Sequence, residues 1–162
     1  MVGRKTLDFQ FSILNFQMNS QLFKHFTPIQ LRFKDYDALQ HVNNANYLTY
    51  IESARTDYIE AVLKNEIDWA ETSMILARAE VNFKLPVLLN EKIGVRTRCS
   101  RLGSKSFDLA YSVVRLKDGK EDEVANALTV MVCFNYQRNE TIPVPQKWKE
   151  IFMAFEGESL AL

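Results

Sequence analysis

The residues best suited to chemistry gather in one short stretch. Asp37 and His41 occupy a polar loop, and Asn43 and Asn44 follow at once, where a long helix is predicted to begin. A carboxylate can serve as a general base or a nucleophile. The free N–H groups at a helix N-terminus favour negative charge nearby. This stretch is therefore the strongest candidate for a catalytic site.

Each of these residues also has a purely structural explanation. An acidic residue ahead of a helix is a common cap, so Asp37 could hold the loop or the helix start instead. His41 could orient a substrate, donate a hydrogen bond to a carbonyl, or only fasten the loop. Asn43 or Asn44 can cap the helix. On the residues alone, both interpretations of Asp37 stay open.

The elements that must position these groups are a strand before the loop and a helix after it. Residues 27–33 (TPIQLRF) alternate, which predicts a strand with Ile29, Leu31 and Phe33 on one face. From about Ala45, a helix is predicted by apolar positions at helical spacing: Tyr47, Tyr50, Ile51, Ala54, Tyr58, Ala61 and Val62. Tyrosines at such spacing usually belong to a core.

Four further strands are predicted after the helix. Met74 to Leu85 has the clearest alternation of the chain and stops at Pro86, and Glu91 to Ser100 follows. Lys105 to Leu116 comes next, and an Asp-Gly turn then leads to Val124–Tyr136, whose near-continuous apolar character predicts a strand buried on both faces. A short amphipathic helix, Gln146 to Phe155, ends the pattern.

This order predicts an α+β domain in which a curved antiparallel sheet of about five strands wraps around one long helix. The helix is the only element long enough to cover the apolar face of the sheet. Such a sheet has exposed edges, so pairing between two copies of the chain is expected.

Composition places the chain among single-domain proteins and excludes several classes. It has 162 residues, of which 47% are hydrophobic, and 20 basic residues balance 20 acidic ones, so no nucleic-acid partner is indicated. No apolar run approaches a membrane span, and Cys99 and Cys133 in strand-like runs suggest buried, reduced thiols of a cytoplasmic protein. The two histidines, His25 and His41, do not have the spacing of the common zinc motifs. No phosphate-binding or serine-nucleophile motif occurs.

Residues 1–20 do not share the pattern of the rest. They predict an N-terminal extension, possibly disordered or the product of a mis-assigned start, ahead of a domain over residues 21–162. The opening segment is basic but interrupted by polar residues, which makes it a poor signal peptide.

The segment from Asp35 to Arg55, DYDALQHVNNANYLTYIESAR, resembles the signature of hotdog-fold acyl-CoA thioesterases of the 4-hydroxybenzoyl-CoA thioesterase type. The later VNFKLP (81–86) and SKSF (104–107) segments occur in the expected order. The resemblance covers about residues 24–145. It implies a hotdog fold, homodimers or homotetramers with a continuous sheet, and hydrolysis of acyl-CoA without a metal or cofactor.

The resemblance also implies roles for single residues. Asp37 matches the catalytic carboxylate of the family, as nucleophile or general base. Asn44 falls where a backbone N–H at the helix start polarises the thioester carbonyl, and His41 takes a secondary role. Tyr47 could line the acyl pocket, and Lys105, with Arg101 across the Gly103 turn, could hold the phosphates of coenzyme A. An ordinary solvated hairpin explains these two basic residues equally well.

Two features of the stretch leave room for alternatives. The family often has glycine where this chain has Gln40, so a side chain close to the thioester is expected to change substrate shape or loop geometry. Glu52 is a rival carboxylate on the helix, although an ion pair with Arg55 explains it better.

Other functions compete with acyl-CoA hydrolysis. Acyl-carrier-protein thioesters could be the substrate, and a hotdog hydratase or dehydratase could use Asp37 and His41, although their spacing and the following VNN do not fit that motif. A non-catalytic acyl-CoA-binding protein is the third alternative. Sensors of this fold usually carry a DNA-binding segment, and the first 20 residues are too short for a helix-turn-helix.

Overall fold

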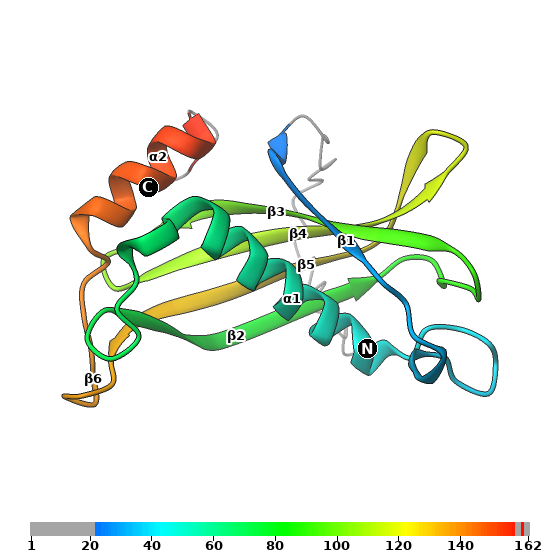
Figure 1. The fold of residues 1–162 in the computed structure, drawn as a ribbon, viewed down its shortest axis with the longest axis horizontal. Coiled ribbons are helices and arrows are strands. Elements are labelled where there is room, and N and C mark those ends of the chain that lie inside the picture. The colour runs from blue at the N-terminus through cyan, green and yellow to red at the C-terminus, as the bar shows by residue number, and fades with distance from the viewer. Residues whose placement is uncertain (1–21, 158–159, 161–162) are drawn as a thin grey trace, which may run out of the picture.

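The computed structural model describes residues 22–157 and 160. Figure 1 shows one sheet with a long helix lying across it. The strands are β1 (His25–Ile29), β2 (Ser73–Phe83), β3 (Lys92–Leu102), β4 (Ser106–Lys117), β5 (Lys120–Asn135) and β6 (Glu140–Thr141). The helices are α1 (Asn44–Leu63) and α2 (Gln146–Glu156), with short 3₁₀ turns η2 (Phe33–Asp35) and η3 (Lys64–Glu66).

The sheet is antiparallel, in the order β1-β3-β4-β5-β2, and β6 pairs with the end of β5. Hairpins join β3 to β4 and β4 to β5, as the turn residues predict. In the second hairpin Asp118 and Gly119 both have positive φ, 50° and 74°, the backbone that an Asp-Gly turn adopts. The curled sheet around one helix confirms the predicted hotdog architecture.

Helix α1 holds the core together. Its buried side chains face the sheet: Tyr47, Tyr50, Ile51, Ala54, Tyr58, Ile59, Val62 and Leu63. The predicted apolar stripe of this helix is wrong at one position: Ala61 is exposed, and Ile59 is buried instead. Each fully buried aliphatic or aromatic side chain is worth about 1.5–3 kcal/mol relative to exposure. This face therefore fixes the helix, and with it the position of its N-terminus.

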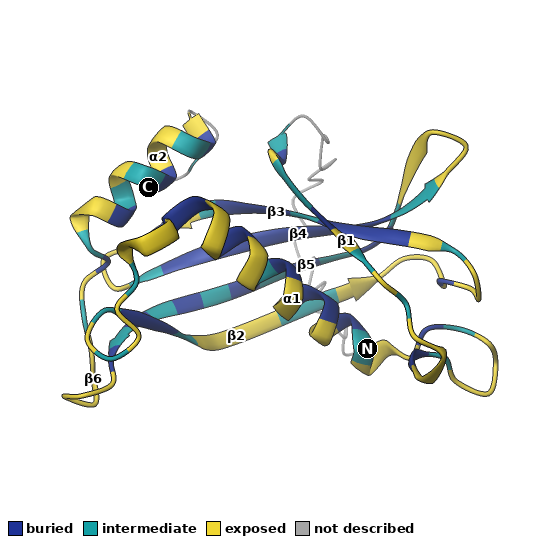
Figure 2. Cartoon of the chain, viewed as in Figure 1, coloured by how far each residue is buried: buried dark blue, intermediate teal, exposed yellow. Residues whose placement is uncertain are grey.

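Two strand predictions need correction. The first strand covers His25–Ile29 rather than 27–33, and Phe33 is 91% exposed. The chain turns into η2 because Asp35 bonds back to Arg32, which ends the extended conformation. Along β5, buried residues alternate with half-buried ones (Figure 2), so only one face is covered within this chain.

The two edges of the sheet differ in length. β1 is short and contains Pro28, which cannot donate to a neighbouring strand. β2 has eleven residues, pairs only with β5 among the described strands, and exposes most of its side chains from Leu76 onward (Figure 2). β2 is therefore the long edge available for pairing.

Helix α2 packs near the C-terminal end of α1 and buries Trp148 and Phe152. Both cysteines are buried and free, as expected. The predicted extension over residues 1–20 lies outside the described residues. None of the helices in the described part of the chain is both long and apolar enough to cross a membrane.

Candidate active site

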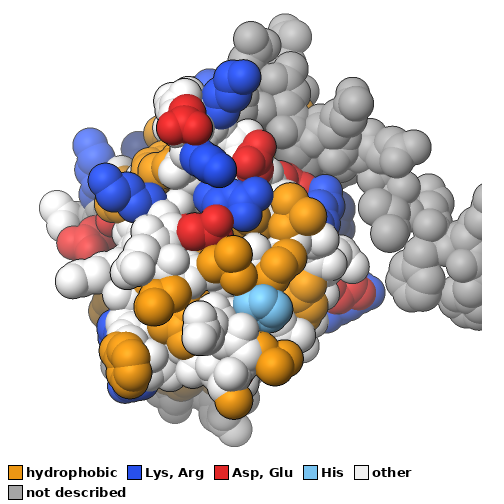
Figure 3. All heavy atoms as spheres, turned by 90° about the vertical axis from the view of Figure 1, so that its right-hand side faces the viewer, with side chains coloured by type: hydrophobic (Ala, Val, Ile, Leu, Met, Phe, Trp, Pro, Cys, Tyr) orange, Lys and Arg blue, Asp and Glu red, His pale blue; other side chains and the backbone are white. Residues whose placement is uncertain are grey.

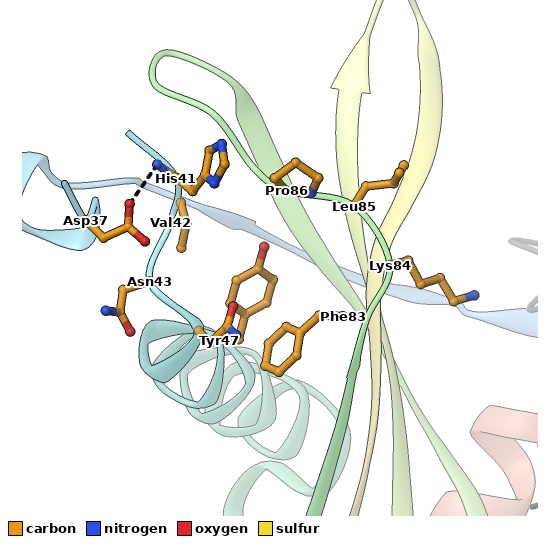
Figure 4. Close-up of a pocket in the computed structure, with 10 residues that line it drawn as sticks. Asp37, His41, Val42, Asn43, Tyr47, Phe83, Lys84, Leu85 and Pro86 are labelled. Carbon is orange, nitrogen blue, oxygen red and sulfur yellow. Dashed lines mark hydrogen bonds between the residues drawn. The ribbon is translucent and has the colours of Figure 1, made fainter. Parts of the chain in front are cut away.

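A pocket of about 420 Å³ opens where the loop before α1 meets the end of β2. Its lining includes Asp37, His41, Asn43, Asn44 and Tyr47 from the loop and the first turns of α1, together with residues 83–86 from the end of β2 (Figure 4). Hydrophobic side chains surround a single histidine on this end of the molecule (Figure 3). Segments separated by about forty residues thus build the pocket together.

The Asp37 carboxylate is exposed at the pocket and held by the backbone of its own turn. Its Oδ1 accepts hydrogen bonds from Leu39 N (2.8 Å) and His41 N (3.2 Å). Its backbone N–H donates to His41 O (2.8 Å), and its carbonyl accepts from Gln40 N (3.0 Å). Within the described residues no hydrogen bond engages Oδ2. The loop therefore fixes one oxygen and leaves the other open to a substrate.

Gln40 follows in the same turn with φ +61°, a left-handed conformation that glycine adopts without strain. This backbone gives a physical reason why the family often has glycine here. The side chain of Gln40 is not part of the pocket lining. The expected effect of Gln40 on substrate shape or loop geometry stays a prediction.

The start of α1 presents N–H groups to the pocket. Asn43 is the N-cap, and its Oδ1 accepts a hydrogen bond from Ala45 N (2.9 Å). Asn44 is the first helical residue and lines the pocket. Among the described residues nothing accepts a hydrogen bond from its backbone N–H. The positive end of the helix dipole thus reaches the pocket next to the Asp37 turn.

His41 lines the pocket but does not pair with the Asp37 carboxylate through its ring. Its backbone makes the bond to Asp37 and forms a bridge to Leu88, while the imidazole points away toward Pro86 (Figure 4). The geometry suits contact with a bound molecule better than activation of Asp37.

Tyr47 forms the inner wall of the pocket. Its side chain is buried, and its ring meets Phe83 edge-on with ring centroids 5.0 Å apart. Burial raises the pKa of Tyr47, so its hydroxyl stays protonated. Phe83 was predicted only as an apolar strand residue, and its place in the pocket depends on how β2 meets α1, which local periodicity does not reveal.

Asp35 is buried and does not line the pocket. Its side chain is fully buried and bonded to Arg32 through the backbone N (2.9 Å), Nε (3.0 Å) and Nη2 (2.9 Å). Burial pushes the pKa of Asp35 upward, but the hydrogen bonds from Arg32 outweigh it and hold the pKa below its ordinary value. Asp35 is therefore an ionised structural group.

Arg101 and Lys105 lie at the opposite end of the sheet from this pocket (Figure 1). Arg101 forms a double hydrogen bond with Asp108 (2.8 and 3.0 Å), and Lys105 Nζ contacts Thr141 Oγ1 (3.1 Å). A single chain does not bring them to Asp37, so their predicted contact with coenzyme A requires another copy of the chain.

Glu52 also stands apart from the pocket. It pairs with Arg55 at 3.4 Å, as expected, and the two line a separate groove of about 820 Å³ between α1 and the start of β2. The rest of that groove combines apolar residues, including Ile59, Trp69 and Met74, with further polar and charged ones. Asp37 is thus the one predicted carboxylate that faces the pocket.

Comparison with known proteins agrees with this geometry. Residues 31–152 match the thioesterase-like superfamily. The chain belongs to this superfamily. It is a thioester hydrolase with the hotdog fold.

Individual relatives span most of the chain. It is 26% identical over 127 residues to the long-chain acyl-CoA thioesterase FadM of Escherichia coli, covering 76% of this chain and 93% of that protein. A Thermus thermophilus thioesterase solved with coenzyme A and zinc is 30% identical, with a TM-score of 0.70 over 84% of this chain and 97% of that one. A thioesterase-superfamily structure from a Jannaschia species has a TM-score of 0.77 at 22% identity, covering 86% of this chain and 87% of that one, and shows the fold alone.

Proposed function

We propose that the protein hydrolyses acyl-CoA thioesters to a free carboxylic acid and coenzyme A, with Asp37 as nucleophile or general base. One observation carries this proposal: Asp37 and Asn44 line the same pocket, and within the described residues the Asp37 Oδ2 and the Asn44 backbone N–H have no hydrogen-bond partner. The relative named as a long-chain acyl-CoA thioesterase and the structure containing coenzyme A support this carrier.

Asp37 can act in either of two ways. As a nucleophile, Oδ2 bonds to the thioester carbon, the C–S bond breaks, and the coenzyme A thiolate leaves; water then hydrolyses the mixed anhydride and restores Asp37. As a general base, Asp37 takes a proton from a water molecule that attacks the same carbon; the C–S bond then breaks, and the coenzyme A thiolate leaves and takes up that proton. In both cases the Asn44 N–H and the α1 dipole stabilise the oxyanion. His41 contacts the substrate in a secondary role.

Tyr47 and its neighbour Phe83 supply the apolar wall against which the acyl group packs. The edge-on contact between the two rings gives this wall a defined shape at the inner end of the pocket.

The catalytic unit in this proposal is at least a dimer, paired through β2. An unpaired edge of eleven residues invites pairing, and a two-fold axis closes it symmetrically. Antiparallel pairing of β2 with its copy reverses the direction of the second sheet. The Lys105 end of one subunit then lies on the same side as the Asp37 pocket of the other, where Arg101 and Lys105 can meet the phosphates of coenzyme A.

Two measurements test the proposal. Free thiol release is measured across acyl-CoAs of increasing chain length, aromatic acyl-CoAs and acyl-carrier-protein thioesters. Release from acyl-CoA is the expected result. Faster release from acyl-carrier-protein thioesters would make these, and not acyl-CoA, the substrate. Hydration of an enoyl-CoA, or binding without turnover, would overturn hydrolysis as the function.

Sedimentation or light scattering at micromolar concentration should show a dimer or tetramer. A monomer with full activity would contradict the shared site while leaving Asp37 as the catalytic group.

A further inference from the structure

The start of α1 is attached to the Asp37 loop through one backbone carbonyl, that of Asp35. It accepts hydrogen bonds from Asn43 N (2.9 Å) and from the side-chain amide of Asn46, whose Nδ2 lies 2.9 Å away. Asn43 is the helix cap, and Asn46 lies in the first turn. The two donors flank Asn44, which lines the pocket.

The Asp35 carbonyl is a fixed point because its own side chain is immobilised. The carboxylate is fully buried and receives three hydrogen bonds from Arg32. Asp37 follows two residues later, and a bridge between Tyr36 and Val42 closes the loop between them. Asp35 therefore connects the segment that carries the carboxylate with the helix that carries the N–H groups.

Asn46 is the side chain that completes this connection. It is half-buried and does not line the pocket, and its side-chain amide donates to the Asp35 carbonyl. The buried face of α1 fixes the helix on the sheet, and the backbone bond from Asn43 gives its N-terminus one contact with the Asp35 carbonyl. The amide of Asn46 supplies a second contact one turn along the helix.

Resting on the proposed function, we infer that Asn46 is a positioning residue, which sets the Asn44 N–H against the Asp37 carboxylate by donating its amide hydrogen bond to the Asp35 carbonyl. Small displacements of catalytic groups are costly in rate, whereas substrate binding through distant contacts tolerates them. Loss of this bond should therefore lower kcat more than it changes KM.

Asn46→Asp separates this role from a general structural one. The substitution keeps the shape of the side chain, but its carboxylate only accepts hydrogen bonds and cannot donate to the Asp35 carbonyl. An acidic residue in the first turn also suits the helix dipole, so the helix should remain stable. Asn46→Ala removes the donor.

The experiment measures kcat and KM of both variants relative to the wild type at pH 8. We expect kcat to fall about tenfold for both, the value of roughly one hydrogen bond, while KM stays within about twofold. Thr49→Asp, which places the same charge on the exposed face of the next turn, serves as the matched control and should retain the kcat of the wild type.

Three outcomes would overturn the inference when the wild type is active: wild-type kcat in both variants, a loss confined to KM, or the same loss of kcat in Thr49→Asp. Thermal unfolding of each variant shows whether it is folded. An inactive wild type would instead refute the proposed hydrolysis, so the two failures are distinguishable.

Discussion

Two carboxylates at opposite ends of α1 show how differently this fold uses the same group. Asp37 is exposed, its contacts are backbone amides of its own turn, and it borders a pocket. Glu156 is 3% exposed, and its Oε1 accepts hydrogen bonds from Tyr58 Oη and from Cys99 N (2.9 Å). The first group is presented to a ligand, and the second joins α2 to α1 and β3.

The contrast has a simple physical basis. A buried carboxylate that accepts hydrogen bonds from two other elements contributes to stability and cannot reach a substrate. A carboxylate anchored through one oxygen in a short turn contributes little to the core and keeps an oxygen for chemistry. Substitution of Asp37 should therefore lower turnover, whereas substitutions around Glu156 should lower the free energy of unfolding.

Asp37→Asn should have the largest effect on activity. We expect kcat to fall about a hundredfold or more, because the amide can act neither as base nor as nucleophile. The Asn Oδ1 can still accept the bonds from Leu39 and His41, so the loop and the unfolding midpoint should be preserved. Steady-state thiol release and thermal unfolding check both statements.

The matched control for Asp37 is Glu52→Gln on the exposed face of α1. Near wild-type hydrolysis by Asp37→Asn would show that this residue only braces the loop. Loss of activity in Glu52→Gln would then make Glu52 the catalytic candidate.

Tyr58→Phe should show the reverse behaviour at the other end. The Tyr58 hydroxyl donates to Glu156 and accepts from Cys99 N (3.1 Å), so its removal should lower the free energy of unfolding by about 1–3 kcal/mol. Turnover should stay within about twofold of the wild type, since no contact reaches the pocket. Denaturant unfolding measures the first effect, with the exposed Tyr136→Phe as the control. A hundredfold loss of kcat without loss of stability would show that the Tyr58–Glu156 region serves catalysis and not stability.

Glu156 should also make the free energy of unfolding depend on pH, with a contribution that falls as the pH rises. Burial raises the pKa of Glu156 above its ordinary value near 4.5, against the hydrogen bond from Tyr58, which lowers it. A carboxyl whose pKa is higher in the folded state favours folding when protonated. Its contribution is therefore greatest below about pH 4.5 and decreases as the pH rises through the raised pKa. The free energy of unfolding of the wild type minus that of Glu156→Gln should fall with rising pH, and a rising difference would contradict this assignment.

The sequence predicted the parts of both regions that depend on local order. The helical spacing from Tyr47 to Val62 located α1, and the Asp-Gly turn located the β4–β5 hairpin, because periodicity and turn chemistry are properties of neighbouring residues. Asp37, Asn44 and His41 were brought together for the same reason: they are close in the chain.

The remaining features depend on contacts between distant residues. Tyr58 and Glu156 are 98 positions apart, and no local pattern pairs them. Phe33 was placed in a strand because alternation continues through it, but the bond between Arg32 and Asp35 ends the strand earlier. The wall formed by Phe83 against Tyr47 needed the packing of β2 on α1.

Lys105→Ala tests whether the end of the sheet far from Asp37 also serves a neighbouring pocket. We expect KM for acyl-CoA to rise about three- to tenfold with little change in kcat, because contacts to the nucleotide contribute equally to ground and transition states. A truncated acyl-pantetheine thioester should be unaffected. Lys120→Ala, in the other hairpin, is the control. Equal effects on both substrates would show that the Lys105 turn does not hold the nucleotide.

Gln40→Gly should have the smallest effect, and it tests whether the Asp37 turn is maintained by its own hydrogen bonds. The left-handed backbone at φ +61° costs a side-chain-bearing residue about 1–2 kcal/mol, and glycine removes that cost. Glycine also gains freedom in the unfolded chain, worth roughly 0.5–1 kcal/mol, so a net stabilisation of about 1 kcal/mol or less is expected. Leu39→Gly, in the same loop but without a positive φ to relieve, should destabilise instead.

The activity of Gln40→Gly should change little. Because the bonds from Leu39 N and His41 N to Asp37 remain in this variant, its kcat should stay within about twofold of the wild type. A larger loss of kcat with unchanged stability would mean that the Gln40 side chain, and not the backbone of the turn, holds the carboxylate in place.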